Sequence, residues 1–271
     1  MSKILTITTL DTEHARSRTL LSVAEKLGYD ARICRLDNPS IIAQIIESDG
    51  VVYGISERNY PLYGEILNRL VSSWQKDLLQ ASFNTFNKCL SYNTLVAASV
   101  PMPKSVTIHN TDDVPFLPGV LKVPCSNQGV GIVLVSSSAE YKKAISELNA
   151  KSSEFLYQEY IKESKGSDKR LLIVSGGCVA AMRRVSTTDD FRANLSLGGK
   201  AEKYTPTQQE IAISIAATNA SNLPYAGVDI IDSNRGPLVL EVNPSPGITI
   251  SEITGVNVAA LIIESTVRHD D

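Results

Sequence analysis

One segment limits the possible folds of this chain more than any other, the run G-V-D-I-I-D-S-N-R-G-P-L-V-L-E-V-N-P-S-P-G from Gly227 to Gly247. Two apolar runs, Val228–Ile231 and Leu238–Val242, flank the turn-rich cluster Asp232–Pro237. Apolar runs of this length around Gly, Pro, Asn and Asp are typical of strands joined by a tight turn. The segment therefore predicts a β-hairpin.

The acidic residues of this hairpin are predicted to face each other. A turn centred near Arg235 places Asp229 opposite Glu241, and because side chains alternate along a strand, Asn243 shares the face of Glu241. Like charges directly opposed in a sheet are destabilising, so the pair requires a cation. Oxygen ligands without His or Cys favour Mg²⁺ or Mn²⁺. The alternative is an ordinary exposed hairpin in a different register.

Composition excludes several classes of function. The net charge of −3 and the lack of a Lys- or Arg-rich stripe give no footprint for nucleic acid. The four cysteines and three histidines are scattered, with no C-x-x-C pair, which argues against zinc, a disulfide framework or a His-based centre and fits a reducing compartment. No apolar run reaches the length of a signal peptide or membrane span. We expect a cytoplasmic protein without membrane partners.

The first 80 residues have the alternating pattern of a small parallel α/β unit. The predicted strands and helices are Ile4–Thr9, Ser17–Leu27, Ala31–Leu36, Ile41–Ile46, Gly50–Gly54 and a helix over Tyr63–Leu79.

Beyond the helix predicted at Asn87–Ser99, strands follow one another with few helices between them, which indicates antiparallel sheets and α+β character. Expected strands include Ser105–His109, Gly119–Val123, Ile132–Val135, Phe155–Tyr160, Arg170–Val174 and Val179–Arg184. Helices are expected at Ala139–Leu148, Thr207–Ala220 and near Val256–Arg268, with a polar loop over Ser186–Lys200.

A glycine-containing loop follows the strand that carries Lys122. Residues 124–131 read P-C-S-N-Q-G-V-G and lead into Ile132–Val135. Two glycines two apart let backbone amides approach an anion, and the lysine adds positive charge. Since no helix follows, this is neither a Walker A loop nor a dinucleotide fingerprint. A plain hairpin turn is the competing interpretation.

Several arginines lie near the ends of the strands that flank the hairpin. Arg170 opens one predicted strand, Arg184 closes its partner, and Arg192 follows in the run D-F-R-A-N-L-S-L-G-G. A guanidinium binds phosphate or carboxylate bidentately, although a single arginine is more often a solvated surface residue. Their convergence with two carboxylates and an amide indicates a binding site.

These runs together resemble the RimK-type branch of the ATP-grasp carboxylate–amine ligases. In the order of that family, the chain carries Q-E-Y-I-K-E, G-S-D-K-R, D-F-R-A-N-L-S-L-G-G, T-P-T-Q-Q-E, A-G-V-D-I-I, N-R-G-P-L-V-L-E-V-N-P-S-P-G-I and T-G-V-N-V-A. The match extends from about Lys88 to Arg268. It implies an ATP-grasp fold with a pre-ATP-grasp α/β domain (1–82), a central subdomain with a lid loop (83–161) and a C-terminal subdomain with a metal site (162–271).

The resemblance also implies roles for individual residues. The residues implied to bind ATP are Lys88, Lys122, Gln128, Gly129, Gly131, Glu159, Tyr160, Ile161, Asp168, Arg192 and Asn194. Among these, the lysines would contact phosphates, residues 159–161 would border adenine, and Asp168 would hold the ribose. Arg184, Arg192 and Asn194 are implied to be catalytic, and Asp229, Glu241 and Asn243 are implied to hold two Mg²⁺ or Mn²⁺ ions.

The implied reaction joins a carboxylate to an amine through an acyl phosphate. The leading hypothesis is a homo-oligomeric ligase that adds glutamate, or another amino acid, to the C-terminus of a protein or peptide. A small metabolite, an amino-group carrier protein or precursor-peptide side chains are alternative acceptors, and a non-catalytic ATP-binding regulatory module is an alternative class. The chain departs from its relatives in the lid sequence C-S-N-Q-G-V-G and at Lys169, and its first 80 residues match in architecture alone.

Overall fold

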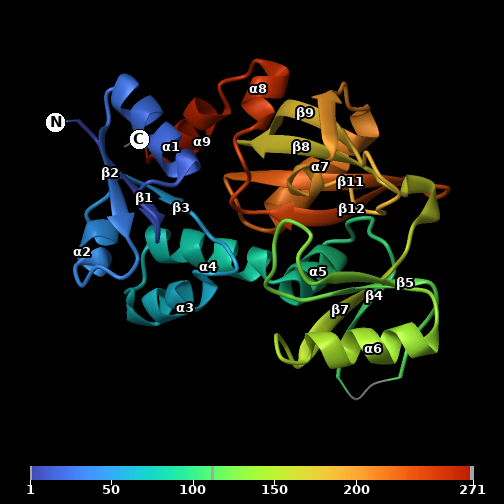
Figure 1. Ribbon diagram of the computed structural model, residues 1–271. Coiled ribbons are helices and arrows are strands. Elements are labelled where there is room, and N and C mark those ends of the chain that lie inside the picture. Colours follow the sequence, from blue (N-terminus) through green and yellow to red (C-terminus); the bar gives the residue numbers. More distant parts are fainter. Residues whose placement is uncertain (1, 111–112, 269–271) are drawn as a thin grey trace.

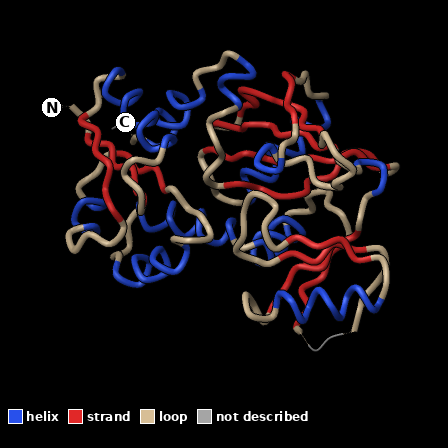
Figure 2. Tube along the Cα trace, viewed as in Figure 1, coloured by secondary structure: helices blue, strands red, loops and turns tan. Residues whose placement is uncertain are grey.

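The computed structural model describes residues 2–110 and 113–268, which form three β-sheets in sequence order (Figures 1 and 2). The first sheet is parallel and the other two are antiparallel. A small parallel α/β region followed by α+β character is therefore confirmed. No helix within the described residues combines the length and apolar character that crossing a membrane requires.

The first sheet has the strand order β2-β1-β3 and is covered by helices. Its elements are β1 (Ile4–Thr9), α1 (Ala15–Lys26), β2 (Asp30–Arg35), α2 (Ile41–Ile46), β3 (Gly50–Tyr53), α3 (Tyr60–Arg69) and α4 (Trp74–Phe86). Because all three strands run the same way, the loops that follow β1 and β3 lie side by side at one edge of the sheet.

The single helix expected over Tyr63–Leu79 is wrong, since the chain breaks between α3 and α4. Leu70 ends α3 with an extended backbone, and Ser73 begins α4 by accepting a hydrogen bond from the Lys76 amide at its side chain. A serine that caps a helix start in this way competes with continuation of the preceding helix.

The second sheet has the order β4-β7-β5-β6, with α6 packed on it. Its elements are α5 (Lys88–Ala97), β4 (Ser105–His109), β5 (Gly119–Lys122), β6 (Ile132–Val135), α6 (Ser138–Leu148) and β7 (Glu154–Glu159). Asn87 caps α5 by accepting from the amides of Cys89 and Leu90. The cap fixes where Lys88 enters the fold, at the first turn of α5.

The third sheet has the order β10-β9-β8-β11-β12. Its elements are β8 (Ser167–Val174), β9 (Gly177–Val185), β10 (Lys200–Lys203), α7 (Gln208–Ala220), β11 (Tyr225–Ser233) and β12 (Gly236–Asn243), with short 3₁₀ turns η1 (Lys162–Ser164) and η2 (Leu195–Leu197). One face packs on α7 through apolar side chains, and alternation places charged side chains on the other. Strand β10 was not predicted, because K-A-E-K lacks an apolar face.

The predicted opposition of Asp229 and Glu241 is confirmed, although the turn differs. The hairpin turns at Asn234–Arg235, between the paired residues Ser233 and Gly236, and an irregularity between Asp229 and Ile230 shifts the register by one residue. This β-bulge restores the pairing that a turn centred on Arg235 would give. Asn243 shares the face of Glu241 and its amide donates to that carboxylate at 3.1 Å.

The chain then returns to the first sheet. Helix α8 (Ile250–Thr254) was not predicted, whereas α9 (Val258–Thr266) confirms the closing helix. Helix α9 packs against α1 and β3, and its Val258, Ile262 and Ile263 join one apolar core with residues of β1 and α1 (Figure 1). The first and third sheets are thereby fastened together, with the second sheet held beside them.

Candidate active site

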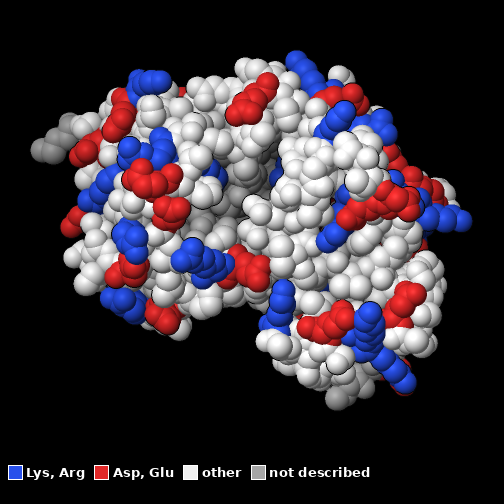
Figure 3. Space-filling view, in the orientation of Figure 1, with Lys and Arg blue, Asp and Glu red and all other residues white. Residues whose placement is uncertain are grey.

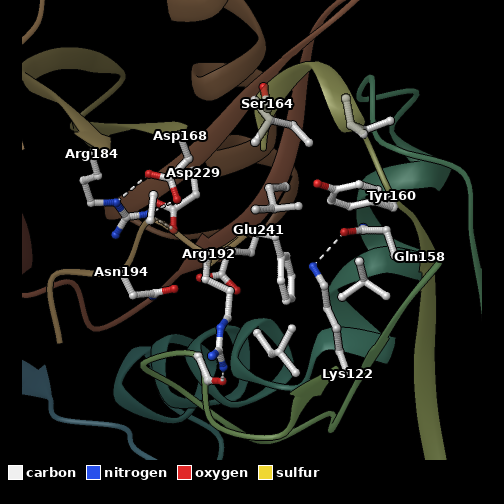
Figure 4. Close-up of a pocket in the computed structure, with 18 of the residues that line it drawn as sticks. Lys122, Gln158, Tyr160, Ser164, Asp168, Arg184, Arg192, Asn194, Asp229 and Glu241 are labelled. Atoms are coloured by element: carbon white, nitrogen blue, oxygen red, sulfur yellow. Dashed lines mark hydrogen bonds and ion pairs between the residues drawn. The ribbon is translucent and has the colours of Figure 1, made fainter. Parts of the chain in front are cut away.

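One cavity between the second and third sheets collects nearly every site residue that the sequence indicates (Figure 4). All of those residues line it except Gly131 and Asn243. Its walls come from the first turn of α5, from β5 and its loop, from the end of β7 and from the charged face of β8, β9, β11 and β12. The structure therefore brings together residues that are up to 153 positions apart, from Lys88 to Glu241.

Asp229 lies at the centre of the charged face, between two arginines. Arg170, directly across the strand pair from it, donates from Nε and Nη2 to the two carboxylate oxygens at 2.6 and 2.7 Å. Arg184 donates from Nη2 to Oδ2 at 2.8 Å. Asp229 is 2% exposed, and burial alone would raise its pKa, yet the two guanidinium groups hold that pKa well below its usual range. Asp229 is therefore an ionised, fully paired carboxylate.

Arg184 also binds Asp168, which completes a buried ion cluster. Its Nε and Nη2 donate to the two oxygens of Asp168 at 2.6 and 2.8 Å (Figure 4). Two carboxylates and two guanidinium groups balance in charge, which offsets the cost of burying each of them. Lys169 points to the opposite face, where its Nζ donates to Glu210 and Asp232 at 2.7 Å, so this departure from the family pattern supports the α7 side of the sheet.

Glu241 differs from Asp229 because it has no arginine or lysine partner within ion-pair distance among the described residues. It lines three adjoining cavities, and within the described part of the chain its one hydrogen bond is the one that Asn243 donates. That bond leaves one carboxylate oxygen of Glu241 and the amide oxygen of Asn243 as available hard ligands. No three His, Cys, Asp or Glu side chains gather as a metal site in the described ranges, yet this donor set fits a divalent ion.

Two buried lysines face the charged sheet from the second sheet and α5. Lys122 donates to the side-chain oxygen of Gln158 at 2.6 Å (Figure 4). Lys88 donates to the backbone and hydroxyl oxygens of Ser126. Burial lowers the pKa of both amines, and that of Lys122 falls to about 8 although Glu241 opposes the shift. Neither lysine has a carboxylate partner in the described chain, so both can bind an anion.

The loop after β5 closes over this cavity. Gln128, Gly129 and Gly131 all have positive φ, at 55°, 78° and 66°. An added Cβ at Gly131 would meet Val123 at 2.7 Å, so glycine is needed there for close backbone approach. Arg192 holds the loop by donating to the Gly129 carbonyl at 2.8 Å while its other nitrogens bind Asp190. Gly131 thus shapes the loop without lining the cavity.

The far end of the cavity is apolar. Tyr160 and Phe191 meet edge to face with ring centroids 6.1 Å apart, and Ile161 is buried beside them. The Glu159 carboxylate is engaged elsewhere, since it accepts from Arg235 at 2.6 Å and from the Lys104 amide at 3.2 Å. This end therefore offers flat apolar surfaces, typical of the part of a pocket that receives a ring.

A second cavity of about 500 Å³ adjoins the first, in the hollow between the first and third sheets (Figure 3). The residues common to both cavities are Asn127, Gln128, Arg184, Asn194 and Glu241. The two cavities thus meet over the unpaired carboxylate of Glu241. Asn243 lines the second cavity from β12.

The sequence reasoning missed several lining residues. Arg170 and Gln158 were noticed in the sequence but not assigned to the site, and the residues of the first sheet that line the second cavity carried no motif. For Arg170 a signal existed, because it lies two residues after Asp168 and so shares its face of a strand. For the first sheet none existed, since those residues meet the cavity only through tertiary packing.

Comparison with known proteins agrees with this geometry. The model of the RimK-like ATP-grasp domain matches residues 85–266. A probable alpha-L-glutamate ligase of Picosynechococcus sp. is 35% identical over 239 residues, covering 85% of this chain and 77% of that relative. A probable alpha-L-glutamate ligase of Xylella fastidiosa is 32% identical over 271 residues, covering 91% of this chain and 89% of that relative.

A solved structure extends the comparison to the fold. The D-alanine–D-alanine ligase of Bacillus anthracis, in complex with ATP, superposes with a TM-score of 0.74 at 16% identity, over 98% of this chain and 97% of that one. The predicted ATP-grasp fold is therefore confirmed. By the match of the family model and the identity of its relatives, the chain belongs to the RimK-like ATP-grasp family, and it is an ATP-dependent carboxylate–amine ligase.

Proposed function

We propose that this ligase adds glutamate to the C-terminal carboxylate of a protein or peptide. The glutamate assignment rests on relatives named probable alpha-L-glutamate ligases. The observation that supports a joining reaction most strongly is the meeting of two cavities over Glu241, Arg184 and Asn194. One cavity has the lysines, loop and apolar end suited to ATP, and the other has room for the amine substrate.

We propose that ATP lies along the first cavity with its base at Tyr160 and Ile161 and its phosphates between Lys88 and Lys122. The loop of Gln128, Gly129 and Gly131 would cover the phosphates, and Glu159 would contribute main chain, because its carboxylate is engaged by Arg235. Asp168, which Arg184 fixes, would present its remaining lone pairs to the ribose. Exclusion of water by the loop protects an acyl phosphate from hydrolysis.

Glu241 and Asn243 would hold a divalent ion, with Asp229 behind them as the ionised carboxylate fixed by Arg170 and Arg184. When bound, such an ion neutralises charge that develops on the transferring phosphoryl group. We propose that the ions are Mg²⁺ or Mn²⁺ and that two of them bind.

The proposed chemistry has two steps. An oxygen of the acceptor carboxylate attacks the γ-phosphorus, the bond to the β,γ-bridging oxygen breaks, and ADP leaves. The amine nitrogen of glutamate then attacks the acyl carbon, the bond from that carbon to the phosphate oxygen breaks, and inorganic phosphate and a proton leave. Arg184 and Asn194 line both cavities and Arg192 lines the first, and these three side chains would stabilise the charge on the phosphate and on the tetrahedral oxygen.

Mass spectrometry of candidate peptides incubated with the protein, ATP, Mg²⁺ and a panel of amino acids tests this proposal. We expect mass increases of one or more glutamyl units at the peptide C-terminus, with one ADP released for each unit. Modification of a side chain, a carrier protein or a small metabolite would replace the acceptor assignment. ATP turnover that no carboxylate and amine pair changes would contradict the ligase assignment for these cavities.

The affinity for ATP should depend on pH through Lys122. Its pKa of about 8 means that the amine is charged below pH 8 and neutral above it in the free protein. The attraction to phosphate is therefore present at pH 7 and lost as pH rises, so the dissociation constant for MgATP should increase about tenfold between pH 7 and pH 9.

Calorimetric titration at several pH values measures this effect, and Lys122→Arg is the matched control. Because a guanidinium remains charged throughout this range, that variant should show a flat profile between pH 7 and pH 9. A wild-type profile as flat as that of the variant would contradict the combination of a lowered Lys122 pKa and a contact between Lys122 and the phosphates.

A further inference from the structure

The wall that the first sheet contributes to the second cavity carries two arginines that form no ion pair with a carboxylate of the described residues. Arg16 lies in the first turn of α1, just after the loop that follows β1, and Arg58 lies in the loop that follows β3. Neighbouring parallel strands put these loops together at the carboxyl end of the sheet. That edge is where open parallel sheets bind ligands.

Arg16 is held in place but is not neutralised. Its Nε donates to the Pro246 carbonyl at 3.1 Å, which orients the guanidinium from the side of the third sheet. Its Nη2 is buried and has no hydrogen-bond partner. The buried Tyr225 hydroxyl is a further polar neighbour, and both the positive charge of Arg16 and its side-chain hydrogen bond with that hydroxyl partly oppose the rise that burial causes in the pKa of Tyr225. A buried, unsatisfied donor of this kind is costly unless a ligand completes it.

The other arginines that line the cavity, Arg170 and Arg184, are neutralised by carboxylates. Arg170 and Arg184 are paired with Asp229 and Asp168, so they add little net charge. Asp11 lines the same wall as Arg16 and is exposed, and it forms no ion pair with Arg16 or Arg58. The first-sheet wall therefore carries two guanidinium groups against the single carboxylate of Asp11, and the Glu241 carboxylate lies where the two cavities meet.

We infer that Arg16, with Arg58 at the rim of the cavity, binds a carboxylate of the amine substrate that the reaction does not consume, and so selects an anionic amino acid. This inference rests on the proposed function and names the group that recognises the substrate. A guanidinium binds a carboxylate through paired charge-assisted hydrogen bonds, and Arg16 lines the cavity without a carboxylate partner among the described residues. With the carboxylate at Arg16, the amine end of the substrate lies toward the junction over Glu241.

The orientation follows from the separation of charge along the cavity. A wall of net positive charge and the Glu241 carboxylate at the junction favour one direction of binding for a molecule that carries both an amino group and carboxylates. A neutral or cationic side chain would leave the donor of Arg16 unpaired. Sites built around a buried polar partner reject analogues that lack that partner.

The test is the Arg16→Gln variant, measured by calorimetric binding of glutamate in the presence of Mg²⁺ and a non-hydrolysable ATP analogue. We expect glutamate binding to weaken about 10- to 100-fold, because a hydrogen-bonded charge pair is lost, while binding of the ATP analogue changes less than twofold. In turnover, the KM for glutamate should rise by the same factor and kcat should change little. Arg58→Gln should give a smaller loss, since Arg58 is exposed.

Two further variants separate recognition from support of the fold. Arg16→Lys keeps a positive charge and a donor near Pro246, so it should recover most of the affinity. Arg18→Gln removes an exposed arginine two residues along the same helix, outside the cavity, and should bind glutamate as the wild type does. Glutamine identifies the carboxylate. If Arg16 binds the side-chain carboxylate, the preference for glutamate over glutamine disappears in Arg16→Gln. If glutamate and glutamine lose affinity equally, Arg16 binds the α-carboxylate, and its selection of an anionic amino acid is overturned.

Unchanged glutamate binding in Arg16→Gln would overturn the inference, and so would a loss in which the ATP analogue and the melting temperature change together with glutamate. The binding assay requires no turnover. Arg16-dependent binding of glutamate by a protein that joins it to none of the peptides would leave this inference standing while the proposed acceptor fails. Amide formation by the wild type, together with unchanged glutamate binding in Arg16→Gln, would leave the proposed function standing while this inference fails.

Discussion

Glu241→Ala is expected to lower the rate of ATP-dependent amide formation by about 10³-fold and to leave the fold intact. The side chain lines all three cavities and forms no ion pair with arginine or lysine among the described residues, so its removal breaks no buried ion pair, although the buried amines of Lys88 and Lys122 lose a negative charge that raises their pKa. It does remove the hard oxygen ligand beside Asn243, and a divalent ion contributes several kcal/mol of charge stabilisation in phosphoryl transfer. ADP release and product mass, measured together, give the rate.

The matched control for this variant is Glu252→Ala, which removes an exposed carboxylate on α8 outside the cavities. Its rate should equal that of the wild type. Circular dichroism and the melting temperature of Glu241→Ala should also match the wild type. An active Glu241→Ala enzyme would exclude this carboxylate as a metal ligand and would require another set of donors.

Asp229→Ala is expected to lower the free energy of unfolding by about 3–5 kcal/mol, in addition to any loss of activity. The two arginines that bind Asp229 are themselves largely buried, and Arg184 is only 3% exposed. Without the aspartate, Arg170 would lose its only ion-pair partner in the described chain and Arg184 one of two. Urea denaturation at pH 7 measures the difference.

The pH dependence of this contribution follows from the depressed pKa of Asp229. A carboxylate whose folded pKa lies below its unfolded value stabilises the fold above the unfolded value, near 3.8, and loses that contribution as pH falls toward the folded pKa. The difference between wild type and Asp229→Ala should thus be constant from pH 5 to pH 8 and should shrink only in acid. Glu241→Ala in the same assay is the control, and equal unfolding curves for the two variants would contradict the ion cluster.

Asp229 and Glu241 also show how far the sequence could be interpreted. Apolar alternation and the turn residues predicted the hairpin and the pairing of these two carboxylates, because both depend on neighbouring residues. From the sequence, both carboxylates were predicted to be metal ligands. They differ because β8 lies beside β11 and brings Arg170 against Asp229, and the order of strands in a sheet is not encoded in any local pattern.

The same distinction holds for the fold. Elements with strong local signals were predicted closely, such as α7, where Thr207 and Glu210 form a capping box. Elements without such signals were missed, among them the edge strand β10 and the short α8. The second cavity could not be predicted because its walls come from Arg16, Arg58 and β12, which meet only when the first and third sheets pack together.

The position of α9 means that the region matched by the family model shares an apolar core with the sheet that precedes it. The matched family region, residues 85–266, ends with a helix whose Val258, Ile262 and Ile263 complete the core of the first sheet. A fragment cut at residue 84 would expose that helix face, and residues 2–84 alone would expose β1 and α1. We therefore expect that the ATP-grasp region does not fold as an independent module and that it unfolds cooperatively with the first sheet.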